Sequence, residues 1–211
     1  MEPSVSQLKS INVYLLRHGK TLGEPALYGH TDVSVATEHQ QAIYQSLMSE
    51  GLGFDTLMTS PLKRCKELAE LIYDNAKHLD YVVAPEWREI SFGDLDGVPF
   101  ATAPESWPVF ETFWQDPANN SLPNAESLDI FYQRISTAWD KFMQTVEKDT
   151  LIVCHGGTIR MILAKVLKLD WSNPALYSSL NIAHHSLTHI QITKAEQSYP
   201  RVCMIGKPLN G

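Results

Sequence analysis

The sequence predicts a single-domain α/β fold in which helices flank a mostly parallel sheet on both faces. Two short apolar runs carry this prediction, INVYLL at 11–16 and TLIVC at 150–154. Each run ends in a glycine-containing loop, as expected for a buried strand that feeds a loop. The second run continues into helical periodicity over 155–169, and strands that alternate with helices form a parallel sheet between two helical layers. A chain of 211 residues is compatible with one continuous core, so we expect one domain over 1–211.

A further strand and two helices are expected between these runs. The segment DTLMTS at 55–60 predicts a strand, and Pro61 suits the first turn of a helix whose apolar positions repeat as far as Ile72. From 127 to 146, apolar residues recur at steps of three and four, which predicts a long amphipathic helix. Ser127 opens that segment, and we expect its hydroxyl to cap the helix.

The other segments differ in character. The stretch 98–125 is rich in proline, asparagine and tryptophan, which indicates an insertion with short helices and no strand. Two segments that resemble strands, around 186–193 and 201–206, are expected to complete the sheet.

Charge and composition exclude several classes of function. The chain has 24 acidic and 17 basic residues, a formal net charge of −7, and no block of lysine or arginine, which argues against a nucleic-acid partner. The first ten residues lack a signal-peptide pattern and no segment reaches the length of a membrane span, so no membrane association is expected. Cys65, Cys154 and Cys203 lie far apart in apolar runs, which favours core residues in a reducing cytoplasm over disulfides or a zinc site. The sequence indicates no particular oligomeric state.

Three strand ends are expected to deliver the functional residues. Arg17 and His18 follow the first strand, Arg64 lies just after the second, and His155 follows the third. Because ligands of open α/β sheets bind at the carboxyl ends of strands, these side chains are predicted to converge. Arginine matches phosphate oxygens with a planar fork of donors, and helix amino termini add backbone N–H groups. The pattern predicts a phosphoryl ligand, with the insertion 98–125 over this site.

Phosphate-ester chemistry needs a nucleophile and a proton donor. A neutral imidazole is a competent nucleophile when a backbone carbonyl holds its other nitrogen, and His18 suits that role. Among nearby acids we favour Glu89 as the donor to the departing oxygen, with Asp94 and Asp96 as competitors. No cluster of carboxylates and histidines has the spacing of a two-metal site, so we expect no metal and no cofactor.

Four ordered motifs, LLRHGKT, SPLKRC, WREISFGDLDG and VCHGGTIR, resemble the signatures of the histidine phosphatase superfamily, which is phosphoglycerate mutase-like in fold. The resemblance covers 11–167, about three quarters of the chain. It implies that His18 is transiently phosphorylated and that Glu89 is the proton donor. It also implies that the phosphate is bound by Arg17, Arg64 and His155, with support from Thr21 and the backbone after Gly156.

Within the superfamily, the runs are most similar to α-ribazole phosphatases of cobalamin assembly, which implies a small-molecule phosphate ester as substrate. Phosphoglycerate mutases usually carry asparagine where this chain has Glu24, and they carry basic residues where it reads GVPFATAPESWP. Lys20 stands where many members have glutamate. The first two departures, at Glu24 and at GVPFATAPESWP, favour hydrolysis over mutase activity, whereas the one at Lys20 is a variation that the family tolerates. The alternatives are a broad-specificity sugar or nucleotide phosphatase, a phosphoglycerate mutase, and a regulatory protein that binds phosphate without catalysis.

Several residues have an ordinary structural interpretation beside a functional one. His184, His185 and His189 are interpreted as polar residues of a sheet edge, since no ligand set for a metal accompanies them. His30 and Asp32 suit either substrate contact or turn hydrogen bonds. The aromatic side chains of the insertion either pack together or cover a planar substrate; they include Trp107, Phe113 and Trp114.

Overall fold

The computed structural model describes residues 9–209. Six strands form one sheet in the order β3-β2-β4-β1-β5-β6. Their bounds are β1 Lys9–Arg17, β2 Thr56–Thr59, β3 Asp80–Val83, β4 Thr150–Cys154, β5 Ser186–Lys194 and β6 Ser198–Pro208. Strands β1 to β4 are mutually parallel, whereas β5 pairs antiparallel with β1 and β6 pairs antiparallel with β5. The predicted α/β fold with a mostly parallel sheet is confirmed.

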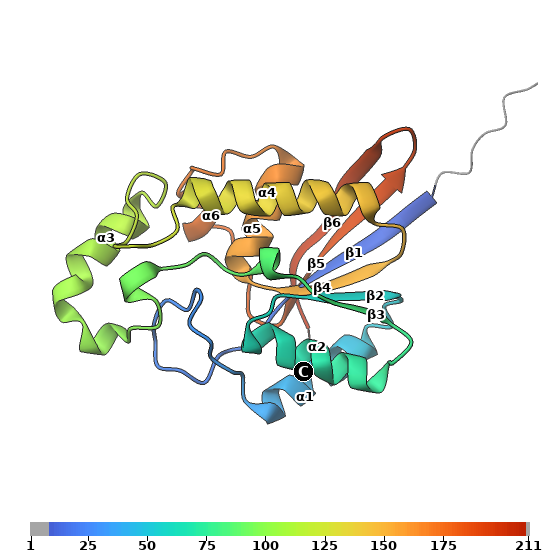
Figure 1. Cartoon of the computed structure of the whole chain (residues 1–211), viewed down its shortest axis with the longest axis horizontal. Coiled ribbons are helices and arrows are strands. Elements are labelled where there is room, and N and C mark those ends of the chain that lie inside the picture. Colours follow the sequence, from blue (N-terminus) through green and yellow to red (C-terminus); the bar gives the residue numbers. More distant parts are fainter. Residues whose placement is uncertain (1–8, 210–211) are drawn as a thin grey trace, which may run out of the picture.

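Helices cover both faces of this sheet (Figure 1). Their bounds are α1 Thr37–Ser49, α2 Lys63–Asn75, α3 Trp107–Gln115, α4 Leu128–Thr145, α5 Gly156–Leu167 and α6 Ala175–Ser178. Short 3-10 turns lie at Pro85–Trp87, Gly93–Leu95, Phe100–Thr102 and Pro104–Ser106. The α1 and α2 helices pack on one face, and α4 and α5 pack on the other.

Alternation along β1 divides the core into two layers. Val13 and Leu15 face the cluster that includes α4 and α5, whereas Tyr14 and Leu16 face the cluster of α1 and α2. This is the period-two alternation of a strand that is buried on both faces. All five residues of β4 are buried, as its uninterrupted apolar sequence predicts.

The long helix α4 starts where its sequence indicates. Ser127 is its N-cap, and the Ser127 Oγ accepts a hydrogen bond of 3.3 Å from the backbone N–H of Ile130. A side-chain oxygen in this place satisfies one of the free N–H groups of the first turn. The predicted cap is confirmed.

The strand register brings the functional loops together. Arg17 pairs with Cys154 at the ends of β1 and β4, and Thr59 of β2 pairs with Val153. Just beyond, the His18 N–H donates to Cys154 O at 3.1 Å and the Ser60 N–H donates to Val153 O at 3.0 Å. The three loops predicted to converge therefore begin side by side at one edge of the sheet.

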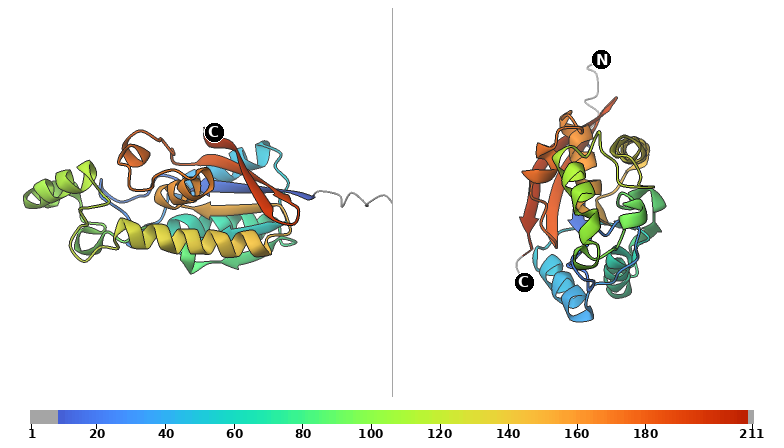
Figure 2. Two further views of the ribbon diagram at one scale, coloured as in Figure 1. Left: turned by 90° about the horizontal axis from the view of Figure 1, so that it is seen from above. Right: turned by 90° about the vertical axis from the view of Figure 1, so that its left-hand side faces the viewer.

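The insertion 98–125 contains no strand, as predicted, and its main element is α3. Figures 1 and 2 show that α3 lies at one end of the molecule, beyond the first turn of α4. Four of its aromatic side chains contact one another, mostly edge to face, and Phe110 is fully buried among them. This aromatic cluster consists of Phe100, Trp107, Phe110 and Trp114.

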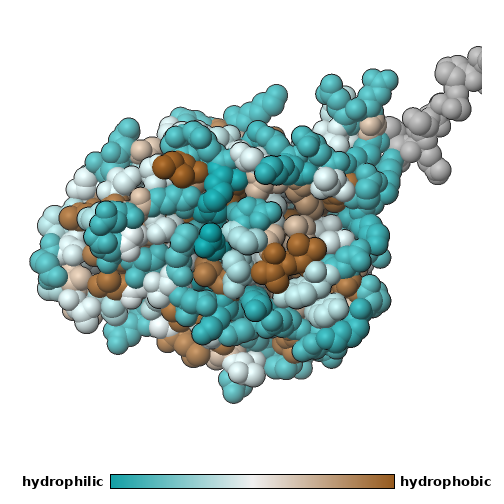
Figure 3. Space-filling model, viewed as in Figure 1, coloured by the Kyte–Doolittle hydropathy of each residue, from teal (hydrophilic) through white to brown (hydrophobic). Residues whose placement is uncertain are grey.

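Two sequence-based expectations concern the rest of the molecule. Cys65 and Cys154 are buried as expected, but Cys203 is exposed, because β6 is an edge strand whose side chains alternate between partly buried and exposed. No helix in the part of the chain that the structure describes combines the length and apolar character needed to cross a membrane. The face seen in Figure 3 is mainly hydrophilic, with separate hydrophobic patches, some of them near α3.

Candidate active site

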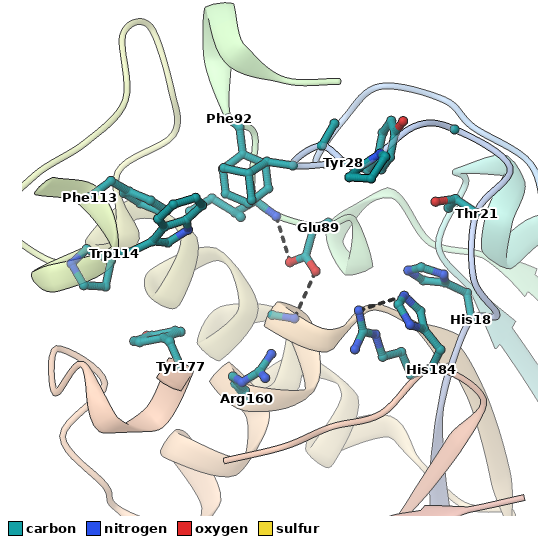
Figure 4. Close-up of a pocket in the computed structure, with 18 of the residues that line it drawn as sticks. His18, Thr21, Tyr28, Glu89, Phe92, Phe113, Trp114, Arg160, Tyr177 and His184 are labelled. Atoms are coloured by element: carbon teal, nitrogen blue, oxygen red, sulfur yellow. Dashed lines mark hydrogen bonds between the residues drawn. The ribbon is translucent and has the colours of Figure 1, made fainter. Parts of the chain in front are cut away.

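A cavity of about 580 Å³ opens at the carboxyl ends of β1 and β4. One end of it is polar and the other is aromatic (Figure 4). The polar end is lined by Arg17, His18, Thr21, Glu89, Arg160 and His184. The aromatic end is lined by Phe92, Phe113, Trp114 and Tyr177. The two ends together suit a phosphate ester with a large apolar leaving group.

His18 lies at the polar end of the cavity, and the residue is 6% exposed. Its Nδ1 lies 2.7 Å from the carbonyl oxygen of Gly19, so Nδ1 carries the proton and Nε2 keeps a free lone pair. Burial, and then the charges of Arg64 and Arg17, lower the pKa of His18 well below its usual value. The imidazole is therefore neutral near pH 7, as a nucleophile must be.

Arg17 is held beside His18 by the segment that precedes β5. Its Nη1 donates to Ile182 O, and its Nη2 lies 3.1 Å from Nε2 of His184. Its Nε is buried and has no partner within the described chain. Two terminal nitrogens are thus anchored, while Nε and the remaining N–H groups are available to an anion.

Glu89 faces the same end of the cavity from the opposite side (Figure 4). Its Oε2 accepts from the N–H of Gly157 at 2.9 Å, and its Oε1 accepts from the N–H of Ile90 at 3.0 Å. A Cβ at residue 157 would collide with Oε1 of Glu89. A side chain at residue 157 would therefore displace the Glu89 carboxylate. The sequence suggests that the Gly157 N–H is free to bind a ligand, but in the structure it donates to Glu89.

The competing acids serve other purposes. Asp96 accepts from the N–H groups of Gly29, His30, Thr31 and Phe92. Burial raises the pKa of Asp96, but these backbone hydrogen bonds outweigh burial and lower it below its usual value. Asp94 accepts a hydrogen bond from Asn124 at the surface. Both carboxylates therefore organise loops, and of the three acids considered from the sequence Glu89 is the one that lines the cavity.

Arg64 and His155 lie beneath the cavity and do not line it. Both are fully buried, and Arg64 Nε donates to His155 Nδ1 at 3.2 Å. The other ring nitrogen of His155 lies 2.7 Å from Ser60 Oγ, and its ring meets the His18 ring edge to face at 5.2 Å. The remaining nitrogens of Arg64 donate to backbone carbonyls of Tyr28, Gly29 and Thr31. The pair supports His18 and the 28–31 loop, and its direct contact with a phosphoryl group stays a prediction.

The remaining sequence-derived candidates divide between the cavity and the loops. Thr21 and Lys20 line the cavity. Gly156 begins α5, and a Cβ there would lie 3.1 Å from Arg17 Nε and 3.2 Å from Arg160 Nη1. His30 Nε2 lies 3.0 Å from Glu89 O, and Asp32 accepts from the N–H of Lys63 at 2.7 Å. These last two residues are thus turn contacts in the structure.

Two residues at the polar end of the cavity were not predicted. Arg160 lies one turn beyond Gly156 on α5, with Nε and Nη2 bound to the carbonyls of Leu176 and Leu180 at 3.1 and 2.9 Å. Its position four residues after Gly156 in HGGTIR was the signal, because helix positions i and i+4 share a face. His184 is the second, and its interpretation as a residue of a sheet edge is wrong: it precedes β5 and faces the cavity. Its proximity to Arg17 follows from tertiary packing, which the local sequence does not encode.

His185 and His189 lie outside the cavity, and their interpretation as residues of a sheet edge is also wrong, because His185 precedes β5 and His189 lies in β5, which pairs with β1 on one side and β6 on the other. The backbone of His185 has a positive φ of 46°, and the His189 Nε2 lies 3.0 Å from the Asn12 side chain. Among residues 9–209, no group of three or more His, Cys, Asp or Glu side chains is placed to hold a metal ion.

Comparisons with known proteins agree with this geometry. The sequence model of the histidine phosphatase superfamily (branch 1) matches residues 13–203. The uncharacterized phosphatase PhoE of Bacillus subtilis (strain 168) is 31% identical over 186 residues, which are 86% of this chain and 89% of PhoE.

Two solved structures share the fold. Bacillus stearothermophilus YhfR has a TM-score of 0.80 at 24% identity, with 93% of this chain and 97% of that chain covered. The alpha-ribazole phosphatase from Shigella flexneri has a TM-score of 0.75 at 20% identity, with 95% and 100% covered. The protein therefore belongs to the histidine phosphatase superfamily (branch 1) and is a phosphatase of that family.

Proposed function

We propose that the protein hydrolyses α-ribazole 5′-phosphate through a phosphorylated His18. The observation that carries the proposal is a neutral imidazole with a free Nε2 at the polar end of a cavity whose other end is aromatic. Arg17 and Glu89 line the same end of the cavity as this nitrogen. In this arrangement His18 is the nucleophile, Arg17 binds the phosphoryl oxygens and Glu89 is the proton donor.

The reaction consists of two phosphoryl transfers. In the first, Nε2 of His18 attacks phosphorus, the bond from phosphorus to the ester oxygen breaks, and this oxygen takes a proton from Glu89. In the second, Glu89 accepts a proton from water as the water oxygen attacks phosphorus and the bond to Nε2 breaks. Charge on the transferring group is stabilised by Arg17, with Thr21, Arg64 and His155 as further proposed contacts.

The aromatic end of the cavity supports a flat leaving group. Trp114 and Phe113 come from α3, and Phe92 and Tyr177 face them from other segments (Figure 4). An aromatic face stacks on a planar base with a gain of about 1 to 3 kcal/mol per base. α-Ribazole 5′-phosphate is a benzimidazole nucleotide, and its flat base suits this end of the cavity. The likeness of the fold to an alpha-ribazole phosphatase also supports this substrate.

Arg160 is the proposed contact for the sugar of the leaving group. It lies between Glu89 and Tyr177 in the cavity, and its Nη1 makes no hydrogen bond within the described chain (Figure 4). A guanidinium donor in this place matches the hydroxyl oxygens of a ribose. The substrate would thus span the cavity from phosphoryl group to base.

A panel of phosphate esters tests the proposal by comparing kcat/KM. We expect kcat/KM for α-ribazole 5′-phosphate to exceed that for nucleoside monophosphates, sugar phosphates and para-nitrophenyl phosphate by about 10-fold or more. The reason is that contacts to its base and sugar stabilise the transition state. Equal values across the panel would indicate a broad-specificity phosphatase. Conversion of 3-phosphoglycerate to its isomer in the presence of a bisphosphoglycerate primer would indicate a mutase, and phosphate binding without turnover of any ester would indicate a regulatory protein.

Metal independence belongs to the same proposal. The charge of the phosphoryl group is matched by guanidinium and imidazole groups, so EDTA should leave the rate unchanged. A large loss of activity with EDTA that Mg²⁺ restores would contradict this.

A further inference from the structure

The loop ahead of β5 holds the nucleophile loop at three points. Ile182 O accepts from Arg17 Nη1, His184 Nε2 lies 3.1 Å from Arg17 Nη2, and the His185 N–H donates to His18 O at 3.2 Å. A short hydrogen bond of 2.6 Å from Ser186 Oγ to Ala183 O fixes the loop itself. Residues 182–186 therefore place His184 at a defined position beside Arg17 and His18.

The contact with Arg17 determines the protonation state of His184. A guanidinium has five N–H donors and no acceptor, so the imidazole nitrogen facing it must supply a lone pair. His184 is thus neutral, with its proton on Nδ1, in the arrangement that the structure shows. Protonation would replace this acceptor by a second positive donor and would break the contact.

The groups that face His184 all favour this neutral form. They comprise Arg17 and His18 from the end of β1, Lys20 from the following loop, His39 from α1, and the adjacent His185. No carboxylate is among them. Burial, followed by the charge of Arg17 and then those of the other neighbours, lowers the pKa of His184 to about 4.

We propose that His184 is a positioning residue that, as a neutral imidazole, orients the Arg17 guanidinium toward the phosphoryl group at His18. The inference rests on the proposed function of this site. With Nη1 bound to Ile182 O and Nη2 bound to His184, the plane of the guanidinium is fixed at two points. Its Nε, buried and without a partner in the described chain, and its two remaining N–H groups are then left for the phosphoryl oxygens. His184 itself need not touch the substrate.

A double-mutant cycle with Arg17 separates positioning from a general structural role. His184→Ala should lower kcat/KM for para-nitrophenyl phosphate about 10-fold, since a hydrogen bond to a charged group is lost. Arg17→Ala should lower it by about 100-fold or more. If His184 acts through Arg17, the double variant should match Arg17→Ala alone. Independent losses that multiply in the double variant would overturn the proposal.

Two further variants serve as controls. His184→Gln keeps a carbonyl oxygen at similar reach and should restore most of the activity lost in His184→Ala. His39→Gln replaces a nearby exposed histidine that does not contact Arg17, and it should behave as the native protein. If His184→Gln is as defective as His184→Ala, while both variants stay folded, acceptance from Arg17 is not the role of this residue.

The acid limb of the pH profile gives a readout that a packing role would not move. Below pH 5 the native enzyme should lose activity more steeply than His184→Gln, because in the native enzyme His184 becomes protonated in addition to the other groups of the site. Identical acid limbs would contradict the proposal.

Binding of inorganic phosphate, followed by calorimetry through the same cycle, tests the inference without turnover. Phosphate affinity should fall about 10-fold in His184→Ala and not further in the Arg17→Ala background. Coupling in phosphate binding without hydrolysis would refute the proposed function alone. Additive effects on binding, in an enzyme that still forms phospho-His18, would refute the role of His184 alone.

Discussion

At the scale of single residues, hydrogen bonds to the backbone decide which atoms of the site are free to react. The Nδ1 of His18 is engaged by Gly19 O at 2.7 Å, so only Nε2 remains for chemistry. Asp96 is saturated by backbone N–H groups, so it is not free to exchange a proton with a substrate. Glu89 is the carboxylate left at the polar end of the cavity near His18, apart from Glu24 in the outer loop.

Glu89→Gln tests the proton donor. Gln cannot supply a proton, so kcat/KM for α-ribazole 5′-phosphate should fall by about 100-fold or more. Para-nitrophenyl phosphate should lose much less, because nitrophenolate departs without a proton. The measurement is the ratio of the two losses. Equal losses on both esters would show that Glu89 acts in binding and not as an acid.

Gly157→Ala tests the placement of the same carboxylate. The added Cβ would collide with Glu89 Oε1, and the carboxylate would have to leave the position defined by the Gly157 N–H. Activity should therefore fall by about 100-fold, comparable to the loss of a positioned acid. Gly53→Ala is the matched control, because a Cβ at residue 53 meets nothing within 4 Å. A fully active Gly157→Ala enzyme would show that this contact is dispensable.

The residue types, but not all their roles, were predictable from the sequence. His18, Glu89 and Arg17 were placed correctly in the cavity because strand ends and short motifs fix them locally. Arg64 and His155 were predicted to bind the phosphoryl group, and the structure places both fully buried beneath the cavity, because each has buried hydrogen-bond partners in distant segments. His184 could not be assigned, because its role depends on a contact between residues 167 positions apart.

At the scale of elements, α3 supplies two of the aromatic side chains that line the cavity, Phe113 and Trp114. Trp114 lines the cavity, whereas Trp107 packs in the same aromatic cluster without reaching it. Both are similarly exposed, at 41% and 43%. Trp107 is therefore a suitable control position for substitutions of Trp114.

Trp114→Ala should lower kcat/KM for α-ribazole 5′-phosphate by roughly 10-fold, from the loss of stacking on the base. Para-nitrophenyl phosphate, which lacks the large leaving group, should be nearly unaffected. Trp107→Ala should leave both rates close to native, which controls for disturbance of α3. Equal losses on the two esters in Trp114→Ala would indicate packing in place of stacking.

Sequence patterns were informative for some elements and weak for others. The uninterrupted run of β4 and the repeated apolar steps of α4 allowed both to be predicted, including the cap at Ser127. The helix α1 was not predicted, because polar Gln40 and Ser46 occupy buried positions in its apolar face. The strand β3 was missed because it has four residues, three of them exposed, at the edge of the sheet.

At the scale of the whole molecule, the buried neutral histidines link catalysis to stability. Burial is the first cause that lowers the pKa of His18, His155 and His184, and neighbouring positive charges follow. In the unfolded chain these side chains have a pKa of about 6.5 and become protonated near that pH, whereas in the folded protein they stay neutral there. The folded state is therefore destabilised relative to the unfolded state as the pH falls below that value.

The free energy of unfolding should thus decrease from pH 7.5 to pH 5. Each histidine contributes a slope of at most about 1.4 kcal/mol per pH unit between its unfolded pKa and its lower folded pKa. Urea unfolding at a series of pH values measures the slope. His155→Gln should reduce it, whereas substitution of the exposed His78 should not. A constant free energy of unfolding over this range would contradict the assignment of neutral, buried imidazoles.

The central claim is that His18 carries the phosphoryl group during turnover. The direct measurement is rapid mixing with excess substrate, an alkaline quench that preserves phosphohistidine, and mass spectrometry of the digested protein. We expect a phosphoryl group on His18 within the first turnover, and neither adduct nor turnover in His18→Ala. Full activity of His18→Ala, or a phosphoryl group carried by a different residue, would contradict the account.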